Sequence, residues 1–224
     1  RKALDRVGLA LPEIYIELNI DQGIASKDSL LKKMIRDSKG RDLLITLPIV
    51  SKLYKNNPLE GDVKLVEMLT PLADYAASYQ VNLAIYPHYS LYCESIQHAV
   101  KIATMAARPN IGIVFNLCHF LKVEGETQIE EALTQSMPHL MMVSICGADA
   151  GDTKNMDWNR LIQPLGAGSF DTYRFVKLLK DKGYQGRIGL QCYNIKADAA
   201  TALSQSLNTW NSYKNKYSAS LKGN

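Results

Sequence analysis

The chain has 224 residues and a mass of 25.0 kDa, with 46% hydrophobic and 21% charged residues. These fractions are typical of a soluble globular domain and exclude a disordered or collagen-like chain. The formal net charge of +4 comes without a dense basic stripe, which argues against nucleic-acid binding. No apolar run approaches the ~20 residues that are needed to cross a bilayer.

The hydrophobic pattern switches along the chain between a period of two, typical of strands, and a period of 3.6, typical of helices. We expect strands at residues 13–20, 42–49, 81–88, 110–117, 139–146 and 187–193. Helices are expected at residues 26–37, 62–78, 91–107, 127–136, 171–182 and 198–213. No repeat or linker divides the chain, so we predict a single domain over residues 1–224, with parallel strands joined by helices.

Local signals refine these elements. Ser90 is the expected N-cap of the helix at 91–107, and Ser169 precedes the helix at 171–182. Pro71 is expected to kink the helix at 62–78 or to mark its start. The four cysteines have no zinc-ligand spacing, and we expect all of them to be small buried apolar residues. They are Cys93, Cys118, Cys146 and Cys192.

An alternating β/α chain forms either an open doubly wound sheet or a closed (β/α) barrel. No GxGxxG or GxxxxGK[ST] motif supports a nucleotide-binding sheet. The strands put large apolar residues on one face and small or polar residues on the other, as at 81–88, where Asn82, Tyr86 and His88 share a face. A sheet covered by helices on both sides would be apolar on both faces, so the pattern favours a barrel with a polar mouth.

Polar side chains gather where the expected strands end. They are Asn19, Asp21, Tyr86, His88, Asn116, His119, Ser144, Asp149, Gln191 and Asn194. The C-terminal ends of parallel strands share one edge of the sheet, and ligands bind there in such folds. We therefore place the functional site at this edge.

Five segments have the order and spacing of motifs in a known protein family, namely LAIYPH, NIGIVFNLCHF, HLMMVSICGAD, PLGAGSFD and GYQGRIGLQ. Together they resemble the xylose isomerase-like TIM-barrel superfamily, over about residues 4–210 and most specifically at 164–186. The resemblance implies an α/β fold of the (β/α) TIM-barrel type. That superfamily includes sugar (phosphate) isomerases and epimerases and the endonuclease IV group.

A TIM barrel typically has ~250 residues. Because this chain is shorter and starts at Arg1, we expect part of the N-terminal strand to be missing from the sequence and its first residues to end a helix.

The resemblance also implies a divalent metal held by Glu, Asp, His and Glu at successive strand ends. In the same order, this chain has Tyr86, Asn116, Ser144 and Gln191 at those positions. His88 and His119, which belong to the first two family motifs, are retained. Because neutral side chains bind a divalent cation far more weakly than carboxylates, we predict no metal ligands. The alternative is Zn, Mn or Mg at a relocated site of His88 and His119 with Asp149 or Glu17.

The remaining groups suit a carbohydrate, because they offer hydrogen bonds and aromatic faces. The expected substrate-binding residues are Tyr86, Asn116, Ser144, Gln191, Tyr193 and Lys154. Isomerisation of a sugar needs a base that removes a carbon-bound proton and a group that holds the resulting oxyanion. The catalytic candidates are His88, His119, Glu17 and Asp149. His98 and His139 are expected to be structural or surface residues.

Three functions follow from the residues and the resemblance. The first is a sugar or sugar phosphate isomerase or epimerase with an altered metal dependence. The second is a catalytically silent barrel that binds a carbohydrate, and the third, which is disfavoured, is an endonuclease IV-like DNA-repair enzyme. The expected partner is a small-molecule carbohydrate, without nucleic acid or membrane, and a homo-oligomer is left open. The sequence leaves the compartment open, either cytoplasmic or, if a signal peptide was removed, periplasmic or secreted.

Overall fold

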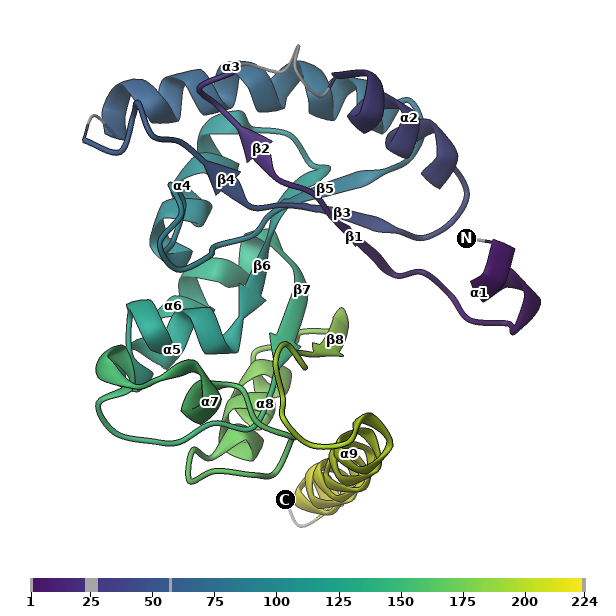
Figure 1. The fold of residues 1–224 in the computed structure, drawn as a ribbon, viewed down its shortest axis with the longest axis vertical. Coiled ribbons are helices and arrows are strands. Elements are labelled where there is room, and N and C mark those ends of the chain that lie inside the picture. Colours follow the sequence, from purple (N-terminus) through teal and green to yellow (C-terminus); the bar gives the residue numbers. More distant parts are fainter. Residues whose placement is uncertain (1, 23–27, 57, 223–224) are drawn as a thin grey trace. The chain divides into compact units, whose positions relative to one another are not determined.

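The computed structural model describes residues 2–22, 28–56 and 58–222, and strands alternate with helices along them (Figure 1). The strands are β1 (Glu13–Tyr15), β2 (Leu18–Asn19), β3 (Leu44–Leu47), β4 (Ile49–Val50), β5 (Asn82–Ile85), β6 (Ile111–Asn116), β7 (Leu140–Ile145) and β8 (Arg187–Leu190). The helices are α1 (Lys2–Arg6), α2 (Asp28–Ser38), α3 (Pro58–Ala77), α4 (Ile96–Ala106), α5 (Leu117–Val123), α6 (Ile129–Ser136), α7 (Trp158–Leu161), α8 (Thr172–Asp181) and α9 (Ala199–Lys222).

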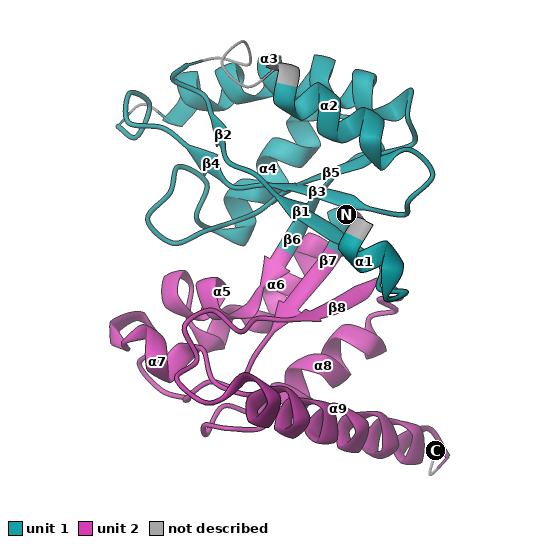
Figure 2. Cartoon of the chain, turned by 45° about the vertical axis from the view of Figure 1, so that its right-hand side comes forward, with its two compact units in different colours: residues 1–114, 139–141 teal, residues 115–138, 142–224 magenta. Residues whose placement is uncertain are grey.

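Hydrogen bonding orders the larger sheet as β1-β3-β5-β6-β7-β8, and β2 pairs with β4 in a smaller one. The pairs β1–β3, β3–β5, β5–β6, β7–β8 and β2–β4 are parallel, as expected for strands joined by helices. The chain divides into two compact units (Figure 2). Unit 1 comprises residues 1–114 and 139–141, and unit 2 comprises residues 115–138 and 142–224.

The expected strands at 13–20 and 42–49 are each found as two shorter strands. Their pairing continues across the break, because the backbone N–H groups of Ile16 and Leu18 donate to the carbonyl oxygens of Thr46 and Pro48 at 3.0 and 2.9 Å. Pro48 has no N–H of its own and cannot return a hydrogen bond. The expected strands were therefore right in position and wrong in continuity.

Two helices begin at a different cap from the expected one. Ser95 caps α4, since its Oγ accepts the backbone N–H of His98 at 3.1 Å. Ser90 lies instead in the preceding loop with a left-handed φ of 68°. Asp171 rather than Ser169 caps α8, because its carboxylate accepts a backbone N–H of the first turn. In both cases the apolar pattern begins before the residue whose side chain satisfies the helix start.

Other expectations for helices meet mixed outcomes. α3 runs through Pro71, so this proline does not mark the helix start. Residues 26 and 27 of the expected helix at 26–37 lie outside the described residues, and α2 covers the rest. The short helices α5 and α7 were not expected.

Cys192 is exposed, against expectation, because it follows the end of β8, whereas Cys93, Cys118 and Cys146 are buried.

Two strands of the larger sheet are completely buried, which limits the polar side chains that they can carry. Every residue of β3 and of β6 is buried. A polar side chain on such a strand must find a hydrogen-bond partner, because an unpaired polar group costs about 1–3 kcal/mol when it is buried. Within the described residues, no helix combines the length and the apolar character that a membrane span requires.

Candidate functional site

Three aromatic side chains lie together in unit 1, at the C-terminal ends of β1 and β5. The rings of Tyr15 and Tyr86 meet edge to face with centroids 5.1 Å apart, and the Tyr86 ring lies 6.3 Å from the His88 ring. Tyr86 is buried, whereas Tyr15 is 49% exposed. Burial and the charges of Glu17 and Glu13 raise the pKa of Tyr15, so its hydroxyl keeps its proton at neutral pH. Sequence reasoning missed Tyr15 as a site residue, although its position in the polar phase of the strand was a signal.

The half-buried His88 has a defined hydrogen-bond partner. Its Nδ1 lies 2.8 Å from the backbone carbonyl oxygen of Tyr89. Because a carbonyl can only accept, Nδ1 carries the proton of the neutral ring and Nε2 carries the lone pair. His88 therefore has the tautomer that lets Nε2 accept a proton.

The two carboxylate candidates lie in different settings. Glu17 is exposed between β1 and β2 in unit 1. Asp149 lies in unit 2, where it forms an ion pair with Arg160 at 2.8 Å. Hydrogen bonds from Arg160 and Gln163 lower the pKa of Asp149, so this carboxylate is ionised at neutral pH and is a weak base. The catalytic roles of both residues stay predictions.

Asn116 ends β6 and starts α5, and its side chain is almost completely buried. Its Oδ1 accepts three hydrogen bonds, from the backbone N–H of Cys118 at 3.1 Å, the backbone N–H of His119 at 3.4 Å and the Cys118 thiol at 3.0 Å. The oxygen is thus committed to the start of the helix, as in an N-cap.

This cap gives a first prediction. Asn116→Ala leaves the first N–H groups of α5 without an acceptor and is expected to lower the free energy of unfolding by about 1–2 kcal/mol in urea denaturation. Asn116→Asp is the matched control, because a carboxylate caps a helix as well as an amide does. An equal loss in both variants would contradict the capping role.

His119 lies in the first turn of α5 and is buried. Its ring meets the ring of Trp158 nearly edge to face, with centroids 5.2 Å apart. Lys122, one turn further along α5, donates to the carbonyl oxygen of Met156 at 2.7 Å, and its ammonium lies 5.9 Å from the Trp158 ring. His119 is therefore packed against the segment around α7.

The remaining predicted residues of unit 2 have varied surroundings. Ser144 is half-buried in β7, opposite Gly189 of β8. Gln191 follows β8, and its Oε1 accepts the backbone N–H of Tyr193 at 3.1 Å. The side chain of Tyr193 is 74% exposed, and Lys154 is exposed in the short 3-10 helix Thr153–Asn155. Their roles in substrate binding stay predictions.

The side chains at the family's metal positions do not fit a divalent cation. A phenol, two amides and a hydroxyl stand where the resemblance implies three carboxylates and an imidazole. Two of their oxygens, Asn116 Oδ1 and Gln191 Oε1, already accept backbone N–H groups. Over residues 2–22, 28–56 and 58–222, no group of three or more His, Cys, Asp or Glu side chains is arranged to hold a metal ion. A hard divalent cation is held by negatively charged carboxylate oxygens, and none of these four side chains supplies one.

Comparisons with known proteins agree with this architecture. A family model described as xylose isomerase-like TIM barrel matches residues 38–213. Among solved structures, the IOLI protein with a bound zinc atom superposes with a TM-score of 0.75 at 19% identity, covering 93% of this chain and 78% of that one. L-Ribulose 3-epimerase gives a TM-score of 0.75 at 14% identity, covering 99% and 80%.

A third solved structure, an AP endonuclease of family 2 from Brucella melitensis, has a TM-score of 0.71 at 14% identity and covers 91% and 80% of the two chains. At these identities the likeness shows the fold alone. No curated protein matches the chain significantly in sequence.

Proposed function

Because the chain belongs to the xylose isomerase-like TIM barrel family, we propose that it binds a carbohydrate at the C-terminal ends of its strands and isomerises or epimerises it. The family membership supports an α/β barrel whose strand ends carry the site. A sugar epimerase among the structural neighbours supports the reaction class. The substrate itself, a free sugar or a sugar phosphate, is left to the experiment.

The observation that carries the proposal is the cluster of Tyr15, Tyr86 and His88. It combines a half-exposed aromatic ring, a buried ring that orders it, and an imidazole with a defined tautomer. Aromatic faces stack on the apolar faces of sugar rings, while phenol groups bond to their hydroxyls. In the proposed reaction, the imidazole beside these rings acts on a carbon-bound hydrogen of the sugar.

We assign the proton transfer to His88. In the proposed reaction Nε2 takes the proton from the carbon next to the sugar carbonyl, and the C–H electron pair forms an enediolate. Addition of a proton from water to the other face of the same carbon gives the epimer, and His88 then passes the proton it took to the solvent. Return of the proton from His88 to the neighbouring carbon gives the isomer, once the hydroxyl proton on the deprotonated carbon has moved to the oxygen of the former carbonyl. The imidazole suits this task because histidine is the side chain that most often acts as a general base.

The enediolate oxygen needs hydrogen-bond donors. We assign this role to the Tyr15 hydroxyl of the same cluster, because its raised pKa keeps the proton that it donates at neutral pH. The substrate-binding roles of Asn116, Ser144 and Gln191, which lie in unit 2, stay separate predictions.

Deuterium exchange tests the proposal without knowledge of the product. The protein, washed free of metal with a chelator, is incubated in D₂O with a panel of aldoses, ketoses and their phosphates. We expect one sugar class to lose its C–H signal next to the carbonyl in proton NMR. His88→Gln is expected to slow this exchange by about 10²–10⁴-fold, the usual contribution of a general base.

His139→Gln is the matched control, because His139 makes a structural contact with the Thr104 hydroxyl at 3.2 Å. Exchange that is equally fast in His88→Gln and in the native chain would remove His88 from the mechanism. Absence of both binding and exchange over the whole panel would overturn the proposed function.

The second candidate is a catalytically silent barrel that binds a carbohydrate. The neutral amides at positions 116 and 191 favour it, since they keep the shape of carboxylates without the charge. Saturation-transfer NMR separates the two candidates. A sugar that binds without any exchange of its C–H proton identifies the silent barrel.

A further inference from the structure

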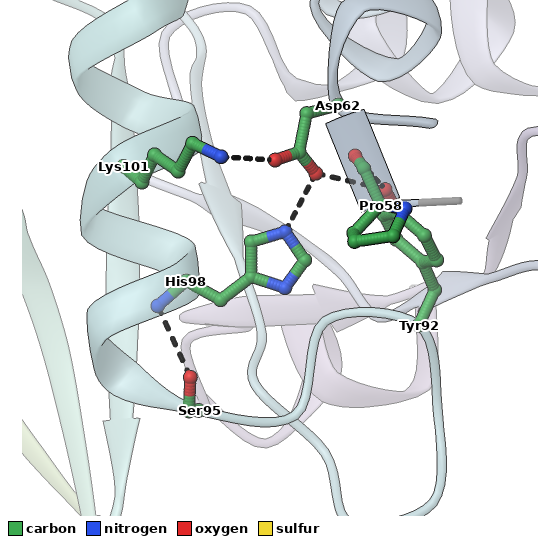
Figure 3. A network of polar contacts seen from close by, with 6 residues as sticks. All are labelled: Pro58, Asp62, Tyr92, Ser95, His98 and Lys101. Carbon is green, nitrogen blue, oxygen red and sulfur yellow. Dashed lines mark hydrogen bonds and ion pairs between the residues drawn. The ribbon is translucent and has the colours of Figure 1, made fainter. Parts of the chain in front are cut away.

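A buried carboxylate joins two helices of unit 1, α3 and α4 (Figure 3). The side chain of Asp62, on α3, is 1% exposed. It accepts hydrogen bonds from the Tyr92 hydroxyl at 2.8 Å, His98 Nε2 at 2.7 Å and Lys101 Nζ at 2.7 Å. Burial raises the pKa of Asp62, but the hydrogen bonds from Lys101, His98 and Tyr92 outweigh it, and the net pKa is lowered. Asp62 is therefore an ionised acceptor.

Tyr92 is fitted closely to the start of α3. Its hydroxyl also lies 2.9 Å from the carbonyl oxygen of Pro58, so one proton is shared between Pro58 and Asp62. A Cβ atom at Gly61 would collide with the Tyr92 hydroxyl and would come within 2.6 Å of Tyr54 Cβ. The absence of a side chain at Gly61 leaves the space that the Tyr92 ring needs.

Tyr92 belongs to the loop that connects β5 with α4 and carries His88. The backbone N–H of His88 donates to the carbonyl oxygen of Cys93 at 3.0 Å, and the N–H of Leu91 donates back to His88 at 3.1 Å. The N–H of Tyr92 donates to the carbonyl oxygen of Ile49, the first residue of β4, at 3.0 Å. The loop is thus closed on itself, and Tyr92 links it to the helix and to the sheet.

We propose that Asp62 is a positioning residue for His88, acting through the Tyr92 hydroxyl. The hydroxyl fixes Tyr92 to α3, Tyr92 fixes the 88–93 loop, and the loop fixes the backbone of His88. The Lys101 ammonium balances the charge of the buried carboxylate, and His98 donates a further hydrogen bond to it. The claim that Asp62 and Tyr92 hold the loop of His88 in place stands on these contacts alone. The claim that His88 is the catalytic base rests on the proposed function.

Histidine side-chain NMR tests the structural part without a substrate. The chain has four histidines, so each imidazole signal is assigned by a single substitution. Tyr92→Phe, which removes the hydroxyl and keeps the ring, is expected to shift or broaden the His88 signal. Asp62→Ala is expected to do the same, while Asp62→Asn, which keeps an acceptor for the hydroxyl, restores the native His88 signal.

Asp74→Ala is the matched control, because Asp74 lies on the same helix and pairs with Arg108 at 2.6 Å in an exposed position. It is expected to leave the His88 signal unchanged. A native His88 signal in folded Tyr92→Phe overturns the proposal, whatever happens in Asp62→Ala.

The exchange reaction then tests the catalytic meaning. In Tyr92→Phe we expect the exchange rate at saturating sugar to fall about 10–100-fold, with little change in the sugar concentration of half-saturation, because a misplaced base slows proton transfer more than it weakens binding. A displaced His88 with an unchanged rate refutes the positioning role in catalysis. A native chain that exchanges no sugar, together with a displaced His88 in the variant, refutes the proposed function and leaves the loop contact established.

Discussion

A variant that combines Asn116→Asp, Ser144→His and Gln191→Glu is expected to bind a zinc ion that the native chain does not. All three positions lie in unit 2, at the ends of β6, β7 and β8. The three substitutions supply one imidazole and two carboxylates. Three such ligands and a water molecule complete the tetrahedral coordination of zinc. The gain follows from charge, because the native amides and hydroxyl cannot neutralise a cation.

The geometry of unit 2 supports this expectation. Ser144 is the register partner of Gly189, and Gln191 lies two residues beyond Gly189, so the side chains at 144 and 191 share a face of the sheet. The strands β6, β7 and β8 are neighbours in the sheet, and Asn116 is the last residue of β6. The three positions are therefore on neighbouring strand ends.

Calorimetric titration and thermal unfolding measure the effect. When free zinc is present at 100 times its dissociation constant, bound metal adds about 2.7 kcal/mol to the free energy of unfolding. We expect this gain in the triple variant and none in the native chain. The control keeps Asn116→Asp and Gln191→Glu but carries Ser144→Ala, which removes the imidazole. A native chain that binds one zinc ion and loses it in Asn116→Ala would contradict the argument.

Phe115→Ala is expected to have the largest effect on stability. Phe115 lies in β6 without exposed surface, and its ring packs against Phe120 at 4.9 Å and Phe175 at 5.4 Å between centroids. Truncation of a buried phenylalanine removes apolar contacts and leaves a cavity, which costs about 3–5 kcal/mol. Urea denaturation followed by circular dichroism measures this loss.

Leu207→Ala on α9 is the control, because Leu207 is 59% exposed. Its unfolding free energy is expected to change by less than about 0.5–1 kcal/mol, as for most surface positions. Comparable losses in the two variants would show that the three phenylalanines do not form the core of unit 2.

The alternation of strands and helices was predictable because it depends on local periodicity. All six expected strands and all six expected helices overlap observed elements. The prediction was wrong about where some helices begin and where some strands break, since these positions depend on single hydrogen bonds. Ser95 rather than Ser90 caps α4, and Pro48 interrupts a strand whose apolar pattern continues through it. The family membership and the barrel fold were also predictable, from motifs at the strand ends.

The candidate site was predictable at the level of residue identity and less so at the level of contacts. The substitution of neutral side chains at Asn116 and Gln191 can be read from the sequence, but the commitment of the Asn116 oxygen to α5 cannot, because α5 itself was not expected. The cluster around Asp62 joins residues 30 or more positions apart in the sequence. No rule of sequence spacing predicts such contacts. The expectation that His98 is a structural or surface residue therefore named neither Asp62 nor Tyr92 as its neighbours.

The helix cap at position 116 also bears on how such a protein changes over generations. Asp and Asn cap a helix about equally well, so an exchange between them leaves α5 intact while it adds or removes a negative charge at the end of β6. In the genetic code the Asp–Asn and Glu–Gln exchanges each need a single base change. A lineage with this fold can therefore pass between a charged and a neutral set of strand ends without an unfolded intermediate.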